Sequence, residues 1–358
     1  MIETAFWKDR NVFITGHTGF KGSWLCLILH RLGAKITGYA QKPPTDPNLF
    51  EIGKVRSLAK TVFSDIRDLQ TLKKSLISTS PEIVVHLAAQ ALVRDSYSNP
   101  VETYSTNVMG TVNVLEGVRD CKGIRSVVIV TTDKCYENKE WVWSYRENEP
   151  LGGFDPYSSS KACTEMVTAA YRNSFFNPEA HKVHNVALAT ARAGNVIGGG
   201  DWAKDRLIPD CIRAVMKREK VVIRNPGAVR PWQHVFEPLT GYLMLAEKLY
   251  KEGPGFGEAW NFGPKDNDAK PVAWIAEKIS NQFGASLVLQ KPSKKRGFRE
   301  ASMLSLDNTK ARQILGWHPK WTLEKAVDRT MTWYKAYMDG QDMRKVCEQQ
   351  IEEYLLEE

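Results

Sequence analysis

The sequence predicts an α/β protein of the Rossmann type, with a doubly wound parallel sheet and a smaller C-terminal α/β lobe. Three observations lead to this fold class. Strand-like and helix-like segments alternate over residues 1–130, and a glycine-rich loop follows the first strand and opens a helix. A later strand then leads into a Gly-rich stretch with no regular period, where a second lobe can begin.

Each expected strand is a short apolar run rich in β-branched residues. In chain order these runs span residues 11–16, 34–40, 61–66, 82–89 and 126–132. The expected helices span residues 23–33, 69–78, 104–121 and 158–173, and Gly33 marks the end of the first. Because strands and helices alternate, the strands should run parallel and carry helices on both faces of the sheet.

A further strand is expected within residues 185–198, and the second lobe should begin at about Arg192. The Rossmann domain is then residues 1–191 with about 232–262, and the smaller substrate-binding lobe is about 192–231 with 263–358. Within that lobe, Asp307 and Gly316 mark the two ends of a capped helix. This division predicts a ligand cleft between the lobes, outside the carboxyl ends of the strands.

Composition excludes several classes of protein. The 358 residues contain no apolar run of about 18, and the first residues lack a signal-peptide core, so we expect a cytoplasmic protein with no membrane partner. The six cysteines are scattered without a CxxC pair, which predicts reduced thiols and no metal site. The net charge of +8 comes from basic residues dispersed among 41 acids, which favours a small anionic substrate over nucleic acid.

The loop TGHTGFKG carries Gly16, Gly19 and Gly22 in a G-x-x-G-x-x-G pattern. Glycines allow the backbone to approach a pyrophosphate closely, and the N-terminus of the following helix supplies amide donors. Many turns contain glycines, but the strand-loop-helix context favours a dinucleotide site. The cofactor contacts expected here come from the three glycines together with Thr18, Phe20 and Lys21.

The far end of the expected cofactor site is unusual. Asp65 and Ile66 follow the third strand, where they can meet the adenine edge. An NAD site usually has an acid after the second strand, but here Gln41 and Lys42 stand in that place. The substitution is compatible with NADP, whose 2′-phosphate Lys42 could accept, and equally with looser binding of NAD.

The stretch VVIVTTDKCYENKE ends a buried strand on two hydroxyls, an acid and a base, Thr131 to Lys134. An ordinary surface turn would explain this ending. However, Tyr157 and Lys161 lie four residues apart on one face of a following helix. A nearby lysine ammonium favours the phenolate, so Tyr157 can act as a base near neutral pH.

Together, TGHTGFKG, HLAAQ, TTD, YSSSK and RLIP resemble the extended short-chain dehydrogenase/reductases that act on nucleotide sugars. The resemblance continues through DNTKARQILGW and covers nearly the whole chain. Dehydratases of that family carry an acid pair after Thr132, whereas epimerases lack it. Asp133 and Lys134 resemble the dehydratase pattern with a lysine in place of the second acid. The resemblance thus implies a 4,6-dehydratase, a lyase that recycles its NAD.

The resemblance also implies roles for these residues. Tyr157 takes the proton of the sugar O4, assisted by Thr132 and Lys161, while the C4 hydride goes to NAD. Asp133 then protonates the leaving C6 hydroxyl, which needs a carboxyl pKa raised by burial. Lys134 is the expected base for the C5 proton, which requires a lowered pKa. Alternatively, Lys134 only orients Asp133, and another base acts.

Further contacts are implied by the same resemblance. The backbone at the end of the fourth and fifth strands should line NAD, through Leu87, Ala88, Ala89, Gln90 and Thr131. The substrate contacts should come from Asn107 (which also braces the site), Asn195, Arg206, Leu207, Arg230 and Arg299. Helices 104–121 and 158–173 should pair across a two-fold axis, giving a homodimer or a dimer of dimers.

Two other functions remain compatible with the sequence. An epimerase or reductase on the same scaffold would have no use for Asp133 and Lys134. A non-catalytic dinucleotide sensor is also conceivable, but such proteins commonly lose the tyrosine-lysine pair, and both Tyr157 and Lys161 are present.

Overall fold

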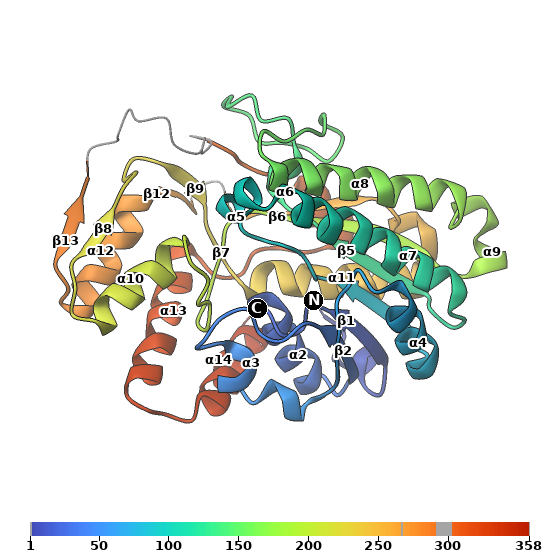
Figure 1. Ribbon diagram of the computed structural model, residues 1–358, viewed down its shortest axis with the longest axis horizontal. Coiled ribbons are helices and arrows are strands. Elements are labelled where there is room, and N and C mark those ends of the chain that lie inside the picture. Colours follow the sequence, from blue (N-terminus) through green and yellow to red (C-terminus); the bar gives the residue numbers. More distant parts are fainter. Residues whose placement is uncertain (1, 266–267, 291–302, 358) are drawn as a thin grey trace.

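The computed structural model describes residues 2–265, 268–290 and 303–357. Its centre is a seven-stranded sheet in the order β11-β6-β5-β4-β1-β2-β3, and every neighbouring pair is parallel (Figure 1). The strands are β1 Asn11–Thr15, β2 Lys35–Ala40, β3 Ala59–Phe63, β4 Ile83–His86, β5 Ser126–Val130, β6 Ala187–Ala193 and β11 Ala259–Phe262. The order reverses between β1 and β4, so the predicted doubly wound sheet is confirmed.

Helices cover both faces of this sheet, as Figure 1 shows. One face carries α4 Leu69–Thr79, α7 Gly110–Asp120 and α8 Pro156–Ser174, and the other carries α2 Phe20–Arg31 and α11 Phe236–Glu252. Neighbouring residues of β1 point to opposite layers: Phe13 packs in one hydrophobic cluster, whereas Val12 and Ile14 pack in the other. The apolar, β-branched strands are therefore buried on both sides, as a parallel sheet requires.

The expected elements differ from the structure mainly at their ends. Helix α2 begins three residues before the expected Ser23, inside the glycine-rich sequence. The strand expected within 185–198 divides into β6 and the short β7 Val196–Ile197. The helix expected from Tyr104 is preceded by α6 Pro100–Tyr104, and a π-helical turn, Ser105–Met109, connects it to α7.

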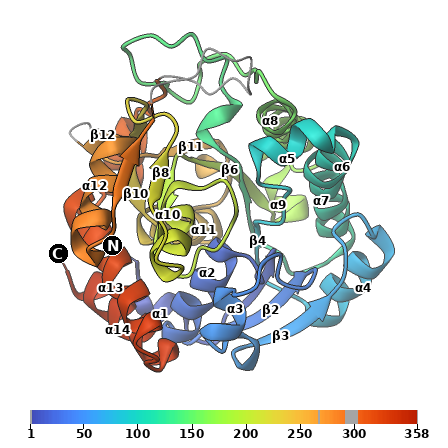
Figure 2. The same ribbon diagram turned by 60° about the vertical axis from the view of Figure 1, so that its left-hand side comes forward.

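The second lobe is built from short strands and helices on one side of the molecule (Figure 2). It contains α10 Leu207–Met216, β8 Val221–Ile223, β9 Val229–Pro231, β12 Ala269–Pro271, α12 Val272–Phe283 and β13 Leu287–Leu289. Strands β8 and β13 pair in parallel, and β9 and β12 pair antiparallel. Strand β10 Gln233–His234 pairs with β7, and the remaining short helices are α1 Thr4–Trp7, α3 Leu49–Ile52, α5 Val93–Ser98 and α9 His181–His184.

Two C-terminal helices, α13 Leu323–Met338 and α14 Met343–Leu356, return to the Rossmann side of the molecule. Helix α14 packs against α2, and Arg31 of α2 forms an ion pair of 3.1 Å with Glu352. The Trp333 indole donates to the Cys347 sulfur at 3.2 Å, which joins α13 to α14. These two helices, within the segment 263–358 expected to belong to the second lobe, therefore cover the helix that opens at the glycine loop.

The division into two domains stays a prediction, since the structure shows elements and not independent folding units. Strand β11, within the expected return segment 232–262, does lie in the main sheet beside β6. Among the described helices, none has the length and apolar character needed to cross a membrane.

Candidate active site

The glycine loop connects β1 to α2 at the carboxyl edge of the sheet. Gly16 has a φ of 76°, and a Cβ added there would lie 2.7 Å from the backbone nitrogen of Ala88. A Cβ on Gly22 would lie 2.2 Å from the Gly16 carbonyl oxygen. Side chains at these positions would push the loop away from β4 and from α2. The glycines thus keep a narrow backbone cradle at a helix N-terminus, which fits a dinucleotide pyrophosphate.

The end of β2 lacks the acid that an NAD site usually has, but Asp65, which follows β3, lies next to it. Asp65 accepts a hydrogen bond of 2.6 Å from the amide of Gln41, the residue that replaces the expected acid. Arg67 forms an ion pair of 2.6 Å with the same carboxylate, and this interaction lowers the pKa of Asp65. Thr18 of the glycine loop donates to the Gln41 carbonyl at 2.9 Å. Gln41 therefore connects the glycine loop to Asp65.

The exit from β4 is held by a buried asparagine. Asn107, in the π-helical turn, accepts from the Gln90 backbone nitrogen at 2.8 Å and donates to the Gln90 carbonyl at 3.0 Å. Its amide also donates to Ser160 of α8 at 2.8 Å. The side chain is only 1% exposed, which fits the expected bracing role. A direct substrate contact, also expected, would require Asn107 to leave these partners.

The end of β5 places the Thr-Asp-Lys sequence in contact with the second lobe. Thr132 donates to Asp133 at 3.0 Å, and the Asp133 oxygen lies so near Gly194 that a Cβ there would be 3.0 Å away. The Lys134 ammonium lies 3.9 Å from the Asp133 carboxylate. The Asp133 side chain is 3% exposed and that of Lys134 is 34% exposed. The acid is therefore enclosed, while the lysine keeps access to a ligand.

Helix α8 presents Tyr157 and Lys161 beside this strand end. Asp155 caps the helix by accepting from the Ser158 nitrogen at 2.9 Å, and the Lys161 ammonium donates to the Val130 carbonyl at 3.2 Å. Burial lowers the pKa of Lys161 to about 8. Burial also raises the pKa of Tyr157 to about 12, although a hydrogen bond with Thr132 acts in the opposite direction.

Burial therefore opposes the expected lowering of the Tyr157 pKa, and the role of Tyr157 as a phenolate base stays a prediction. The desolvation of the phenol outweighs the favourable charges around it, and Asp133 adds to the upward shift of the Tyr157 pKa.

Two arginines of the second lobe have different settings. Arg206 precedes α10 and forms an ion pair of 2.9 Å with the buried Asp201, which raises the Arg206 pKa. Arg230 lies in β9 and lines a hollow of about 310 Å³. Asn195, between β6 and β7, and Leu207, the first residue of α10, are partly exposed. Arg299 lies outside the described residues.

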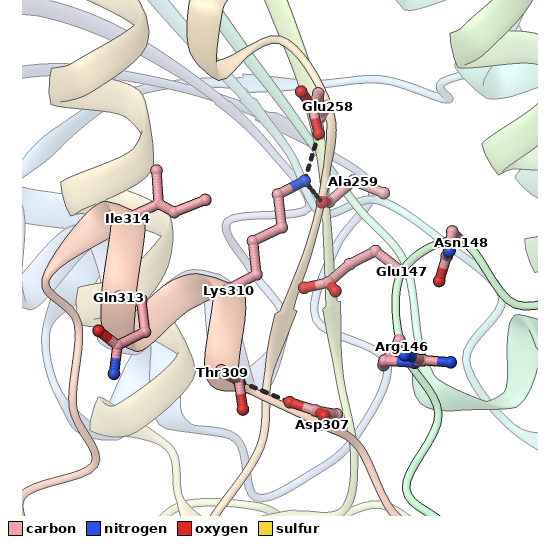
Figure 3. Close-up of a pocket in the computed structure, with 10 residues that line it drawn as sticks. All are labelled: Arg146, Glu147, Asn148, Glu258, Ala259, Asp307, Thr309, Lys310, Gln313 and Ile314. Carbon is pink, nitrogen blue, oxygen red and sulfur yellow. Dashed lines mark hydrogen bonds and ion pairs between the residues drawn. The ribbon is translucent and has the colours of Figure 1, made fainter.

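Figure 3 shows a wider hollow of about 710 Å³ beside β11, whose first residue, Ala259, lies level with Thr15 at the end of β1 through the parallel pairing of the strands. Lys310 crosses it and donates to the Ala259 carbonyl at 3.0 Å and to the Glu258 carboxylate. It is lined by Arg146, Glu147, Asn148, Glu258, Ala259, Asp307, Thr309, Lys310, Gln313 and Ile314. None of the residues predicted to be catalytic lines this hollow, so we place the active site away from it, beside the glycine loop and the end of β5.

Sequence reasoning missed several members of the site. Lys21, predicted to contact the cofactor through the loop, is also electrostatically coupled to Lys161 and Asp133 at the reaction centre. A lysine in the first turn of a helix is unfavourable, because its charge opposes the helix dipole. This unusual position was the sequence feature that could have indicated a further role for Lys21. No sequence feature indicated that Asp201 and Tyr242 belong to the site. Only the tertiary fold brings Asp201 to Arg206 and Tyr242 to Lys21.

The glycine cradle, the Tyr157–Lys161 pair and the hydroxyl and acid at the end of β5 meet at one edge of the sheet. They define an enzyme of the short-chain dehydrogenase/reductase class that uses a nicotinamide dinucleotide. The family model described as GDP-mannose 4,6 dehydratase matches residues 13–330, and the chain belongs to this family.

Individual relatives agree with this assignment. The chain is 53% identical over 357 residues to the CDP-glucose 4,6-dehydratase of Salmonella typhimurium, covering 99% of both chains. The dTDP-glucose 4,6-dehydratase of Streptomyces venezuelae, solved with NAD bound, has a TM-score of 0.76 at 24% identity and covers 92% of this chain and 98% of its own. A UDP-glucose 4-epimerase from Thermotoga maritima scores 0.77 at 23% identity, covering 92% and 99%. Fold similarity alone thus includes epimerases as well as dehydratases.

Proposed function

We propose that this protein is a CDP-glucose 4,6-dehydratase, a hydro-lyase that converts CDP-D-glucose to CDP-4-dehydro-6-deoxy-D-glucose in deoxysugar biosynthesis. The observation that carries the proposal is the 53% identity to the Salmonella enzyme along the full length of both chains. The sequence motifs GHTGFKGSWL, Thr132-Asp133-Lys134 and RPWQHV resemble the same enzyme. Asp133, enclosed beside Tyr157, suits a dehydratase, because an epimerase has no water to eliminate.

The cofactor fits the cradle of Gly16, Gly19 and Gly22, and when bound, NAD accepts a hydride from the sugar C4 and later returns one to C6. Tyr157, on the same helix as Lys161, receives the proton of the sugar O4, and Thr132 holds that oxygen. Lys161 keeps its ammonium against the Val130 carbonyl, so it can orient a ribose or the phenol without moving.

Elimination of water needs a proton at O6 and the loss of a proton from C5. Asp133 is enclosed, and its Oδ1 accepts a hydrogen bond from Thr132. Its other carboxylate oxygen, Oδ2, lies next to Gly194. Lys134 is the proposed base, acting as the neutral amine, since its side chain is more exposed than that of Asp133 and can reach a ligand. The 3.9 Å distance between the two groups also supports the alternative role, in which Lys134 orients the acid.

The nucleoside diphosphate is proposed to bind the second lobe. Arg230 lines the hollow of about 310 Å³ together with Met303 to Ser305, which directly follow the segment that contains Arg299. A planar guanidinium can hold two phosphate oxygens at once. Asn195, after β6, and Arg206 and Leu207, at the start of α10, are proposed to contact the sugar and the inner phosphate.

We further propose a homodimer or a dimer of dimers, acting in the cytoplasm. The support for assembly is the partial exposure of apolar side chains on neighbouring helices, such as Tyr104, Met109 and Met166. The support for the compartment is the absence of a disulfide among the six cysteines, all of which are free thiols.

The proposed function is tested with a panel of CDP-glucose, dTDP-glucose, UDP-glucose and GDP-mannose, each with NAD⁺ or NADP⁺. The expected product, a 4-keto-6-deoxy sugar, is followed by its absorbance in alkali, with Tyr157→Phe as the inactive control. We expect turnover with CDP-glucose and NAD⁺ to exceed every other combination. Equal turnover of all four sugars would contradict the nucleotide assignment, and a 4-epimer as the sole product would contradict the dehydratase itself.

A further inference from the structure

The absence of a side chain at position 194 leaves space beside the proposed catalytic acid. Gly194 follows β6, and its φ is not in the left-handed range, so its backbone conformation does not itself require glycine. A Cβ added there would lie 3.0 Å from Asp133 Oδ2, 3.6 Å from Asp133 Cγ and 3.5 Å from Pro231 Cγ. Only the first of these distances is shorter than an ordinary contact. Glycine therefore keeps one face of the Asp133 carboxyl group open.

The two oxygens of Asp133 have different surroundings. Oδ1 accepts a hydrogen bond of 3.0 Å from Thr132 and lies 3.9 Å from the Lys134 ammonium. Oδ2 has no hydrogen-bond partner among the described residues, although the side chain is only 3% exposed. A buried carboxyl oxygen without a partner is unfavourable. We therefore expect Oδ2 to pair with a polar group of a bound ligand.

The open face of Asp133 lies next to the proposed nucleotide site. Gly194 is partly exposed, and Pro231, on the other side of the space, is the last residue of β9 and directly follows Arg230. Pro231 and Arg230 both line the hollow of about 310 Å³. A nucleotide sugar whose diphosphate meets Arg230 can therefore extend its sugar past Pro231 toward Oδ2. Asp133, Gly194 and Pro231 are the walls of a narrow space, which we call the C6 slot.

We infer that the C6 slot admits the C6 hydroxymethyl group of the sugar, and that Gly194 is a specificity-determining residue because it keeps this slot open. The inference rests on the proposed function, in which Asp133 protonates the C6 hydroxyl as it leaves. A hydroxyl can donate to a carboxylate and can also accept the proton of a carboxyl group, so O6 can pair with Oδ2 before and during elimination. A methyl group at position 194 would obstruct the approach of O6 to Oδ2.

A sugar without C6 distinguishes this role from a general effect on the cleft. CDP-xylose has the same C4 alcohol as CDP-glucose but carries only hydrogen where glucose has its hydroxymethyl group. Its C4 hydride can go to NAD⁺ and its O4 proton to Tyr157, but it has no C6 hydroxyl to lose as water. It therefore does not enter the C6 slot, and a methyl group at position 194 should affect CDP-glucose alone.

The experiment compares the two sugars in the full-length parent and in Gly194→Ala, with NAD⁺ present. Dehydration of CDP-glucose is followed by the absorbance of its product in alkali, and CDP-xylose by calorimetric binding and by NADH formation. We expect Gly194→Ala to lower kcat/KM for CDP-glucose by about tenfold or more, as one misplaced methyl group can do in a specificity pocket. Binding and oxidation of CDP-xylose should not change. Gly255→Ala is the matched control, because an added Cβ in that exposed turn before β11 has no described atom within 4 Å.

Each outcome decides the inference. Unchanged turnover of CDP-glucose in Gly194→Ala overturns it, and so does an equal loss with both sugars, which would mean that the whole cleft is disturbed. If Gly194→Ala does not fold, the parent decides with CDP-glucose methylated at O6. The narrow slot should exclude this sugar, whereas binding as tight as that of CDP-glucose would overturn the inference. A parent protein that dehydrates no nucleotide-glucose contradicts the proposed function instead.

Discussion

At the scale of single residues, the site separates two kinds of chemistry by burial and by neighbours. Tyr157 and Thr132 are linked by a hydrogen bond and face the oxidation step. Asp133 is enclosed next to Gly194, and Lys134 reaches outward from it. These four residues lie within one small volume, yet their contacts fit the different steps proposed for them.

This division of roles predicts different defects. Tyr157→Phe should lose about 10²- to 10⁴-fold in rate, because no group then receives the O4 proton. Asp133→Asn keeps the shape and the contact with Thr132 but cannot protonate the leaving hydroxyl. It should still accumulate reduced cofactor and a 4-keto sugar, visible as nicotinamide absorbance after mixing with substrate. Lys134→Met should also allow oxidation but slow the exchange of the C5 proton with deuterated solvent.

Two results would contradict these roles. Reduction of the cofactor that is blocked in Asp133→Asn as fully as in Tyr157→Phe would show that Asp133 serves oxidation. Full turnover in Lys134→Met would show that Lys134 is not the base.

At the scale of the elements, a buried ion pair holds three of them together behind the reaction centre. Glu165 of α8 and Arg192 of β6 lie 2.9 Å apart, and both side chains are 4% exposed. Thr131, at the exit of β5, donates to Glu165 at 2.5 Å. Arg192 also donates to the Tyr136 hydroxyl at 2.7 Å. The pair therefore fixes the strand end that carries Thr132 and Asp133 relative to the helix that carries Tyr157.

Breaking this pair should destabilise the protein strongly. Arg192→Met leaves the Glu165 carboxylate buried without a cation and should cost about 3–5 kcal/mol of unfolding free energy. Burial alone would raise the pKa of Glu165, but Arg192 and the hydrogen bonds from Thr131 and Thr190 lower it overall. A lowered pKa stabilises the fold above the ordinary glutamate range and loses this effect as pH falls.

Urea unfolding at pH 7 and at pH 4 measures this effect. The difference in unfolding free energy between the parent and Glu165→Gln should shrink at the lower pH. A difference that is equal at both pH values would mean that Glu165 is not the titrating group.

The sequence predicted the parallel sheet and its main helices well, because apolar runs and glycine or capping residues are local signals. The alternation with helices predicts that the first five strands run parallel, but it does not predict their order in the sheet. The pairings of β8 with β13 and of β9 with β12 could not be predicted, since their partners lie far apart in the chain. At the site, the sequence predicted the pair Tyr157 and Lys161 from their spacing. The direction in which the Tyr157 pKa is shifted depends on burial, and no local sequence pattern predicts burial of a single side chain.

At the scale of the whole molecule, the helices α7 and α8 lie side by side on the outer face of the sheet (Figures 1 and 2). Met109, in the turn before α7, is 52% exposed, and Met166 of α8 is 54% exposed. Exposed apolar side chains on neighbouring helices favour burial against a second copy.

A charge on this face should therefore prevent assembly. The parent protein should sediment at micromolar concentration as a dimer or a tetramer, and Met166→Asp should shift it toward smaller species, because a carboxylate would be desolvated in the interface. Met216→Asp, on α10 of the other lobe and 45% exposed, is the matched control and should not change the mass. A strictly monomeric parent would contradict the proposed assembly.

The packing of α14 against α2 has a consequence for how the protein is made. Helix α2 is buried along most of its length, and residues 343–356 supply part of its cover. During synthesis, residues 20–31 leave the ribosome more than three hundred residues before that cover exists. The emerging Rossmann half must therefore keep an apolar helix partly uncovered throughout translation, a period in which exposed surfaces of this kind attract chaperones or aggregate. The cradle for the cofactor can reach its final rigidity only after the polypeptide has been released far enough for α14 to dock.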